Sequence, residues 1–124
     1  MINIGVVGYG YWGPNLVRNL AETPGATVAA VADLDLSKLA TLQRRYPAIK
    51  ATNDFNELLA DPSIDAIAVA TPVHTHFELG LAALRAGKHL WMEKPMTQHA
   101  RQAEQLVDEA ALRGLTLLVD HTFI

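Results

Sequence analysis

After Met1, the chain begins with Ile2-Asn3-Ile4-Gly5-Val6-Val7-Gly8-Tyr9-Gly10-Tyr11-Trp12-Gly13, an apolar run that leads directly into a glycine-rich turn. A helical pattern follows, so the order is strand, turn and helix. In such a turn Gly8 permits a tight bend, Gly10 lets the backbone approach a ligand, and Gly13 lets the helix pack closely on the strand. The helix N-terminus presents N–H groups and the positive end of its dipole. The segment therefore predicts a binding site for a pyrophosphate.

Three aromatic residues and one proline lie in or beside this turn. Tyr9, Tyr11 and Trp12 flank the expected phosphates, and we expect their rings to wall the pocket or to pack rather than to do chemistry. Pro14 falls in the first helical turn, where no N–H partner is needed and its fixed φ suits the helix. The proline thus supports the predicted start of the helix.

The composition is that of an ordinary globular domain. The 124 residues, 50% hydrophobic and 19% charged, suffice for one domain with a sizeable core. The net charge of −3 gives no basic footprint, so we expect no nucleic-acid partner. The absence of cysteine excludes disulfides and thiolate metal sites, and it agrees with a cytoplasmic location. The first cation is Arg18 and no apolar stretch approaches roughly 20 residues, so we expect neither a signal peptide nor a membrane span.

Apolar strand-like runs alternate with helical patterns along the whole chain. The strands are nearly all apolar, as expected when helices cover both faces of a sheet, and right-handed crossovers then give a doubly wound parallel sheet. We predict a single α/β domain of Rossmann type with a six-stranded parallel sheet. The predicted strands are Asn3–Val7, Thr27–Ala32, Ile49–Ala51, Ala66–Ala70, His89–Met92 and Thr116–Val119. The predicted helices are Asn15–Glu22, Leu36–Tyr46, Asp54–Ala60, His74–Ala86 and Gln98–Arg113.

Asp33 follows the second predicted strand, 20 positions after Gly13. A dinucleotide-binding domain has at this place the carboxylate that accepts hydrogen bonds from the adenosine ribose hydroxyls. The same negative charge would repel a 2′-phosphate, so the sequence favours NAD over NADP, and the nearest following cation is Lys38. The alternative is that Asp33 caps the next helix, a role that Asp35 or Ser37 could fill instead.

The stretch Ala70-Thr71-Pro72 ends the fourth predicted strand, where the ligand crevice of such a sheet opens. Pro72 requires an extended backbone before it, and the small residues leave room for a cofactor, so Thr71 and Pro72 are cofactor-binding candidates. His74 and His76 follow. We expect no metal site, because neither cysteine nor a nearby carboxylate pair accompanies them. Each histidine either caps or packs, or it contacts cofactor or substrate.

The element Glu93-Lys94-Pro95 ends the fifth predicted strand. A lysine at the carboxyl end of a central strand faces the ligand crevice, where its ammonium can donate to a substrate hydroxyl and stabilise the oxygen as the C–H bond breaks. The alternative is a surface lysine paired with Glu93. At the end of the last strand, His121 either touches substrate or nicotinamide or is a structural histidine.

These motifs together resemble the Gfo/Idh/MocA oxidoreductases, the family of glucose–fructose oxidoreductase and inositol dehydrogenase. The resemblance covers the whole chain in order and spacing, and the Glu-Lys-Pro element makes it far more specific than a glycine motif alone. It rests on Val6–Asn15, Asp33, Ala70–His76 and Glu93–Pro95. Tyr11–Asn15 and Asp120–Phe123 are similar to the branch that acts on nucleotide sugars, such as UDP-N-acetylglucosamine-type 3-dehydrogenases.

The resemblance implies the chemistry and the residues that perform it. In the family, the lysine of the Glu-Lys-Pro element lies beside nicotinamide and substrate, so Lys94 would be catalytic and would polarise the hydroxyl of the carbon that gives up a hydride. The substrate would be a sugar, a nucleotide sugar or a cyclitol. NAD is the expected cofactor, with NADP less favoured, and no metal is expected. The expected cofactor contacts are Gly8, Gly10, Tyr11, Trp12, Gly13, Asp33, Thr71, Pro72, His76 and Glu93.

Members of this family are commonly much longer, with a second α/β domain that binds the substrate, supplies the proton-transfer pair and forms the oligomer interface. This chain ends at Ile124, so we expect residues 1–124 to be the dinucleotide-binding domain without the substrate domain. Cofactor binding with little turnover then follows, because half of the site is absent. We also expect a homo-oligomer.

Two alternatives belong to other functional classes. A cofactor-sensing Rossmann module would bind without chemistry; the short length favours it, and Glu93-Lys94-Pro95 argues against it. An S-adenosylmethionine methyltransferase shares a glycine-rich first turn. Binding of NAD, NADP and S-adenosylmethionine, measured side by side, separates the methyltransferase hypothesis from the dinucleotide-binding ones.

Overall fold

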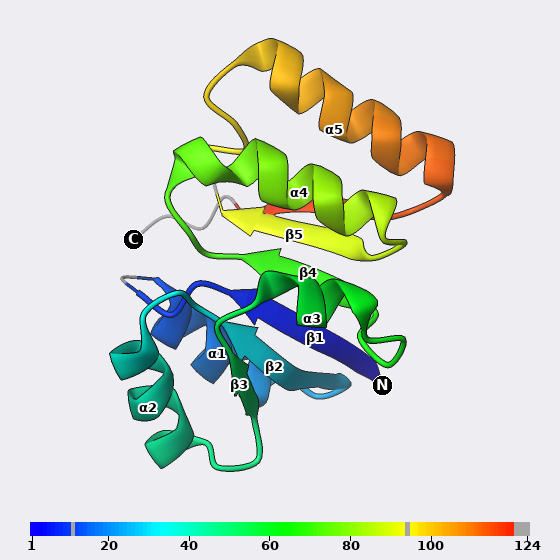
Figure 1. The fold of residues 1–124 in the computed structure, drawn as a ribbon. Coiled ribbons are helices and arrows are strands. Elements are labelled where there is room, and N and C mark those ends of the chain that lie inside the picture. Colours follow the sequence, from blue (N-terminus) through cyan, green and yellow to red (C-terminus); the bar gives the residue numbers. More distant parts are fainter. Residues whose placement is uncertain (11, 94, 121–124) are drawn as a thin grey trace.

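The computed structural model describes residues 1–10, 12–93 and 95–120. The strands are β1 (Ile2–Val7), β2 (Ala26–Ala32), β3 (Lys50–Thr52), β4 (Ala66–Val69), β5 (His89–Glu93) and β6 (Leu117–Asp120). The helices are α1 (Gly13–Ala21), α2 (Leu36–Arg45), α3 (Phe55–Ala60), α4 (His76–Arg85) and α5 (Ala100–Arg113), with a 3-10 helix η1 (Val73–Thr75) before α4. The strands form one parallel sheet in the order β3-β2-β1-β4-β5-β6 (Figure 1). The predicted doubly wound parallel sheet is confirmed.

Helices cover both faces of the sheet, and each layer has its own apolar core. The core under α1 and α2 includes Val6, Leu16, Val17, Leu20, Val28, Val31, Leu39 and Leu42. The core under α3, α4 and α5 includes Leu58, Ile67, Val69, Ala83, Leu84, Leu90, Met92, Leu106 and Ala110. Full burial of one such large apolar side chain contributes roughly 1.5–3 kcal/mol, so these two layers hold the strand ends in fixed relative positions.

An extra residue in β2 interrupts the alternation of side chains between the two faces. The register of β2 against β1 shifts between Ile4 and Gly5, which leaves Ala29 as a β-bulge. As a result Val28 and Val31, three residues apart, both join the core under α1 and α2. The bulge thereby sets the face toward which every later residue of β2 points.

The start of α4 differs from the prediction, because His74 and Thr75 belong to η1 instead. The backbone N–H of Thr75 donates to the Pro72 carbonyl oxygen at 3.0 Å, and the Thr75 hydroxyl donates to the same oxygen at 2.6 Å. This three-residue spacing is that of a 3-10 turn. At the other end of the helix, Gly87 has a φ of +81°, as expected for the glycine that follows a helix C-terminus.

The carboxyl ends of the strands lie along one edge of the sheet (Figure 1). The glycine-rich turn follows β1, Asp33 follows β2, Thr71 comes soon after β4 and Glu93 ends β5. Ligands of open α/β sheets bind at this edge, where the strand order reverses between β1 and β4. Within the described ranges, no helix is both long enough and apolar enough to cross a membrane.

Candidate functional site

The glycine-rich turn is packed so tightly that two of its glycines have no room for a side chain. Gly8 has a φ of +99°, and a Cβ there would lie 2.9 Å from Thr71 Cγ2 and 3.0 Å from the Ala70 carbonyl oxygen. A Cβ on Gly13 would collide with the Gly8 carbonyl oxygen. The roles predicted for these glycines, a tight turn and close helix packing, agree with this geometry.

The N-terminus of α1 is open toward a ligand. Trp12 is the N-cap residue and makes no side-chain capping hydrogen bond, and the first turn contains no acidic side chain. Pro14 occupies the first turn, as predicted. Among the described residues no side chain caps or neutralises this helix end, and the positive end of a helix dipole favours an anion, which a pyrophosphate would supply.

Asp33 is held beside the glycine-rich turn by two backbone donors. Its Oδ2 accepts from the Tyr9 N–H at 2.7 Å, and its Oδ1 accepts from the Asp35 N–H at 2.8 Å. Asp35 is the N-cap of α2 and accepts from the Ser37 N–H at 2.9 Å, and the Ser37 hydrogen bonds lower the pKa of Asp35. The capping alternative for Asp33 is thus wrong. Each Asp33 oxygen retains a lone pair that a ribose hydroxyl can use.

A cavity of about 620 Å³ opens at this edge of the sheet, within the range of small-molecule and cofactor sites. The residues that line it include predicted cofactor contacts that follow β1, β2 and β4. These are Gly8, Gly10, Trp12, Asp33, Thr71 and Pro72. The lining also includes Leu34, Asn53, Phe55, Thr75, Glu78 and Leu79. The sequence analysis missed this second group, although Asn53 follows β3 at the same edge and could have been placed there by the rule for parallel strands.

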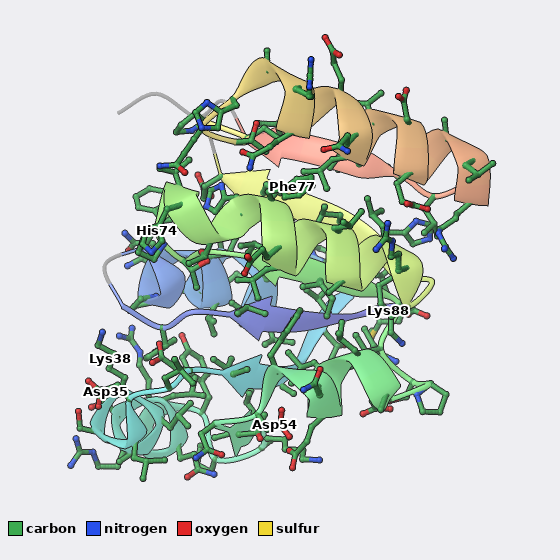
Figure 2. All side chains as sticks on the ribbon, turned by 45° about the horizontal axis from the view of Figure 1, so that its top comes forward. Asp35, Lys38, Asp54, His74, Phe77 and Lys88 are labelled. Atoms are coloured by element: carbon green, nitrogen blue, oxygen red, sulfur yellow. The ribbon has the colours of Figure 1, made fainter. Side chains whose placement is uncertain are left out.

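Lys38 brings a positive charge to the same cavity. Its Nζ lies 3.3 Å from the position that a Cβ on Gly10 would take. Figure 2 shows Lys38 and His74 on the same side of the molecule, with Lys88 at the opposite end. An ammonium beside the glycine-rich turn can attract a phosphate group, whereas the Asp33 carboxylate repels one.

His76 is buried and lies behind the cavity wall. Its side chain is 2% exposed, and its ring nitrogens face backbone carbonyls. Nε2 lies 2.8 Å from the Thr71 oxygen, and Nδ1 lies 3.0 Å from the Pro95 oxygen and 3.2 Å from the Met96 oxygen. His76 is not among the described residues that line the cavity. Direct contact between His76 and a cofactor stays a prediction.

Tyr9 and Trp12, two aromatic residues of the turn, lie in different environments. The Tyr9 ring is buried in the core under α1 and α2, and this burial raises the pKa of its phenol. Trp12 lines the cavity, and its Nε1–H donates to Glu93 Oε1 at 2.6 Å. This hydrogen bond joins the glycine-rich turn to the end of β5, and no local sequence signal predicts it.

Three predicted residues, Tyr11, Lys94 and His121, lie outside the described part of the chain. Within that part, no group of three or more histidine, cysteine, aspartate or glutamate side chains could hold a metal ion. His74 is exposed on η1 while His76 is buried, so the structure separates the environments of these two side chains.

Comparison with known proteins identifies the family to which this chain belongs. A model of the oxidoreductase family with an NAD-binding Rossmann fold matches residues 2–121. The chain belongs to this family, the Gfo/Idh/MocA oxidoreductases. It is 37% identical over 121 residues to the oxidoreductase YdgJ of Escherichia coli, across 97% of this chain and 34% of YdgJ. It is 32% identical over 125 residues to the NADP-dependent scyllo-inositol 2-dehydrogenase IolW of Bacillus subtilis, across 97% of this chain and 33% of IolW.

A solved structure is also similar to this chain. A mutant 3-ketoreductase from Actinomadura kijaniata, in complex with TDP-benzene and NADP, matches with a TM-score of 0.90 and 32% identity. The match covers 96% of this chain and 37% of the reductase. The chain therefore spans about a third of the length of the Gfo/Idh/MocA relatives that it matches.

The described residues fit the cofactor that the Gfo/Idh/MocA family binds. The glycine-rich turn forms a cradle that a Cβ would fill, and the open end of α1 adjoins it. The Asp33 carboxylate lies beside the turn, and the lining of the cavity includes Thr71 and Leu79. A dinucleotide needs these three features together: a close backbone approach, an anion site and an acceptor for ribose hydroxyls.

Proposed function

We propose that residues 1–124 are the NAD-binding part of a dehydrogenase that moves a hydride between nicotinamide and a hydroxyl-bearing carbon of a sugar, a nucleotide sugar or a cyclitol. The observation on which the choice of NAD rests is the Asp33 carboxylate, which two backbone N–H groups hold at the cavity. Its charge favours two ribose hydroxyls over a 2′-phosphate. The inositol dehydrogenase and the ketoreductase among the relatives support the reaction class.

NAD supplies the hydride acceptor when bound, and the chain supplies binding, orientation and a hydrogen-bond donor to the substrate oxygen. The glycine-rich turn and the N-terminus of α1 would hold the pyrophosphate, while Asp33 would accept from the adenosine ribose. The Lys94 ammonium would donate a hydrogen bond to the substrate hydroxyl and stabilise the negative charge that develops on its oxygen. A base elsewhere in the protein would take the hydroxyl proton.

The relatives are much longer than this chain, so the proposed activity differs between residues 1–124 and a protein of the relatives' length. Because they are about three times as long as this chain, we propose the dehydrogenase activity for a protein of that length. For residues 1–124 alone we propose cofactor binding with little turnover. The nucleotide-sugar branch suggested by the sequence stays a prediction about the substrate.

Calorimetric titration of the chain with NAD, NADP and S-adenosylmethionine tests this function. We expect NAD to bind most tightly. Asp33→Ala should weaken NAD binding roughly ten- to a hundredfold, which is the effect of losing hydrogen bonds to a charged group. The same substitution should reduce the preference of the chain for NAD over NADP. Asp35→Ala is the matched control, because it removes a neighbouring carboxylate that caps α2 and should leave the NAD-to-NADP ratio unchanged.

Two results would contradict the proposal. A preference for S-adenosylmethionine would favour the methyltransferase hypothesis. A preference for NADP that disappears in Lys38→Ala would show that the Lys38 ammonium, rather than the Asp33 carboxylate, selects the cofactor. In the longer protein, unchanged turnover of Lys94→Ala with NAD still bound would remove Lys94 from the chemistry.

A further inference from the structure

The cavity extends along the sheet edge to β3, beyond the residues that the proposed function uses. The strand order β3-β2-β1 places Asn53, Asp33 and Gly8 in a row, because each directly follows its strand (Figure 1). All three line the cavity. A dinucleotide with its pyrophosphate at Gly8 and its adenosine ribose at Asp33 would continue along this row. Its adenine base would then come to the end of β3.

A backbone hydrogen bond fixes the start of this loop beside Asp33. The Asp33 N–H donates to the Thr52 carbonyl oxygen at 3.1 Å, and Ala32 pairs with Thr52 in the parallel register of β2 and β3. Neighbouring strands of a sheet lie roughly 4.8 Å apart. Asn53 therefore lies next to the residue whose carboxylate we propose to hold the adenosine ribose.

The local structure after β3 makes no use of the Asn53 carboxamide. Thr52 Oγ1 accepts from the Asp54 N–H at 3.1 Å, and Asp54 Oδ1 accepts from the Asn56 N–H at 3.0 Å and so caps α3. An asparagine in a turn commonly makes such contacts itself, but here its two neighbours make them. Among the described residues, the Asn53 carboxamide has no hydrogen-bond partner. Its donor and its acceptor are therefore available to a ligand.

Apolar side chains line the cavity together with Asn53. They are Leu34, Phe55 and Leu79, and Leu34 is 89% exposed in the absence of a ligand. A flat heterocyclic base in this part of the cavity would cover apolar surface that is otherwise in contact with water. Apolar walls with a few polar groups that fix the orientation of the ligand are typical of small-molecule sites.

A carboxamide has the hydrogen-bonding groups that match one edge of adenine. The adenine N6 amino group is a donor, and it lies beside a ring nitrogen that is an acceptor. An asparagine offers an acceptor, Oδ1, beside a donor, Nδ2, so the two groups can make a pair of hydrogen bonds.

We propose that Asn53 is a specificity-determining residue that recognises the adenine base of the dinucleotide. Asn53 Oδ1 accepts from the adenine N6 amino group, and Asn53 Nδ2 donates to the adjacent ring nitrogen. The inference rests on the proposed function and adds to it the part of the cavity that selects the base.

Calorimetric titration with NAD and with its purine analogue tests this inference. In nicotinamide purine dinucleotide a hydrogen atom replaces the N6 amino group, so the analogue is no larger than NAD and lacks only the donor. The measured quantity is the dissociation constant of the analogue divided by that of NAD. We expect this ratio to be roughly three to ten for the wild type, the effect of losing one hydrogen bond.

Asn53→Leu keeps the approximate size of the side chain and removes its polar atoms. It should weaken NAD binding roughly three- to tenfold and bring the ratio close to one, because the N6 amino group then has no partner to lose. Asn56→Leu is the matched control, since it makes the same change in an exposed asparagine of α3 that is not among the described residues lining the cavity. This control should keep the wild-type ratio.

The inference is overturned if the wild-type ratio is already near one, or if Asn53→Leu changes it no more than Asn56→Leu does. Circular dichroism checks that each variant folds, and Asn53→Ala, which also removes the carboxamide, decides the matter if Asn53→Leu does not fold. If NAD binds, and Asp33→Ala weakens it while Asn53→Leu leaves the ratio unchanged, the inference alone fails. If the wild type does not bind NAD, the proposed function fails and the inference with it.

Discussion

At the scale of single residues, the three glycines of the first turn are not equivalent. Gly13 faces the Gly8 carbonyl oxygen, which is backbone and cannot move aside cheaply. A Cβ on Gly10 would meet only Lys38 Nζ, at 3.3 Å, which is the far end of a flexible side chain. The protein's own packing thus requires Gly13, whereas it leaves space at Gly10, where we predict that a ligand approaches the backbone.

These environments predict that alanine at Gly13 lowers the stability of the fold, whereas alanine at Gly10 weakens NAD binding. Gly13→Ala should destabilise the fold by roughly 1–3 kcal/mol, because it overpacks the contact between α1 and the end of β1. Gly10→Ala should leave the thermal midpoint nearly unchanged and weaken NAD binding, since the new methyl group stands where the pyrophosphate approaches. Denaturant unfolding and calorimetric titration of both variants measure the two effects. Equal losses of stability in both variants would show that this division of roles is wrong.

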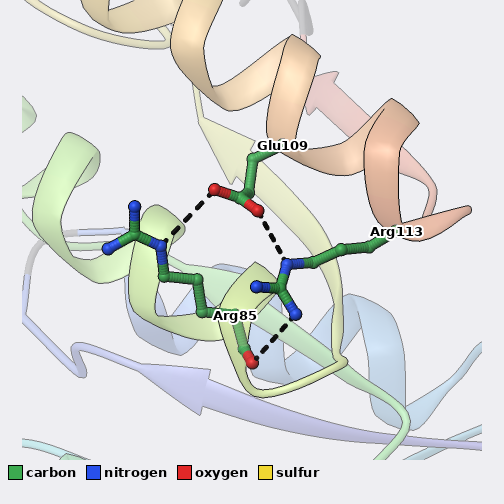
Figure 3. Close-up of polar contacts among 3 residues, drawn as sticks. All are labelled: Arg85, Glu109 and Arg113. Atoms are coloured by element: carbon green, nitrogen blue, oxygen red, sulfur yellow. Dashed lines mark hydrogen bonds and ion pairs between the residues drawn. The ribbon is translucent and has the colours of Figure 1, made fainter.

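At the scale of elements, a single carboxylate joins α4 to α5. Glu109 accepts from Arg113 Nε at 2.7 Å and from Arg85 Nε at 3.4 Å, and Arg113 also donates to the Arg85 carbonyl oxygen at 3.4 Å (Figure 3). Arg113 lies in the last turn of α5, where a cation also interacts favourably with the helix dipole. The Arg113 hydrogen bond holds the pKa of Glu109 below its usual range.

The lowered pKa of Glu109 predicts how the stability of this helix pair depends on pH. A group whose pKa is depressed in the folded state stabilises the fold above its unfolded pKa, and that contribution is lost as pH falls through the folded pKa. Glu109→Gln should therefore have a lower thermal midpoint than the wild type at neutral pH, and the difference should shrink as the solution is acidified. Thermal unfolding over a pH series measures it, with Glu104→Gln as a control on the exposed part of α5. A difference that does not vary with pH would rule out the ion pair as its cause.

At the scale of the whole molecule, the cavity joins parts of the chain that belong to both halves of the sheet. Its lining comes from the ends of β1 and β2 and from the segment after β4, so a dinucleotide bound there would bridge them. A ligand that binds only the folded state stabilises all of it through mass action. Cofactor binding should therefore be visible in global unfolding.

NAD at about 100 times its dissociation constant should add ~2.7 kcal/mol and raise the thermal midpoint by roughly 10 °C. Differential scanning calorimetry at increasing NAD concentration measures this shift, and Gly10→Ala should show a smaller one at the same concentration. A midpoint that S-adenosylmethionine raises and NAD does not would contradict the dinucleotide site.

Several features of this protein were determined by the sequence alone, because they are local. Apolar runs and helical periodicity indicated the strands and helices, and the parallel connection rule then brought the glycine-rich turn, Asp33, Thr71 and Glu93 to one edge. Only the order of these elements along the chain was needed. The carboxyl ends of parallel strands meet at one edge whatever their exact register.

The tertiary structure decided the features that depend on which distant segments meet. The bulge at Ala29 fixes the faces of β2, and the Tyr9 N–H holds Asp33 while Asp35 does the capping. The bond from Trp12 to Glu93 also belongs to this group. Such contacts leave no periodic signal, because their energy arises between residues that are far apart in sequence and become neighbours only when both layers of the sheet are packed.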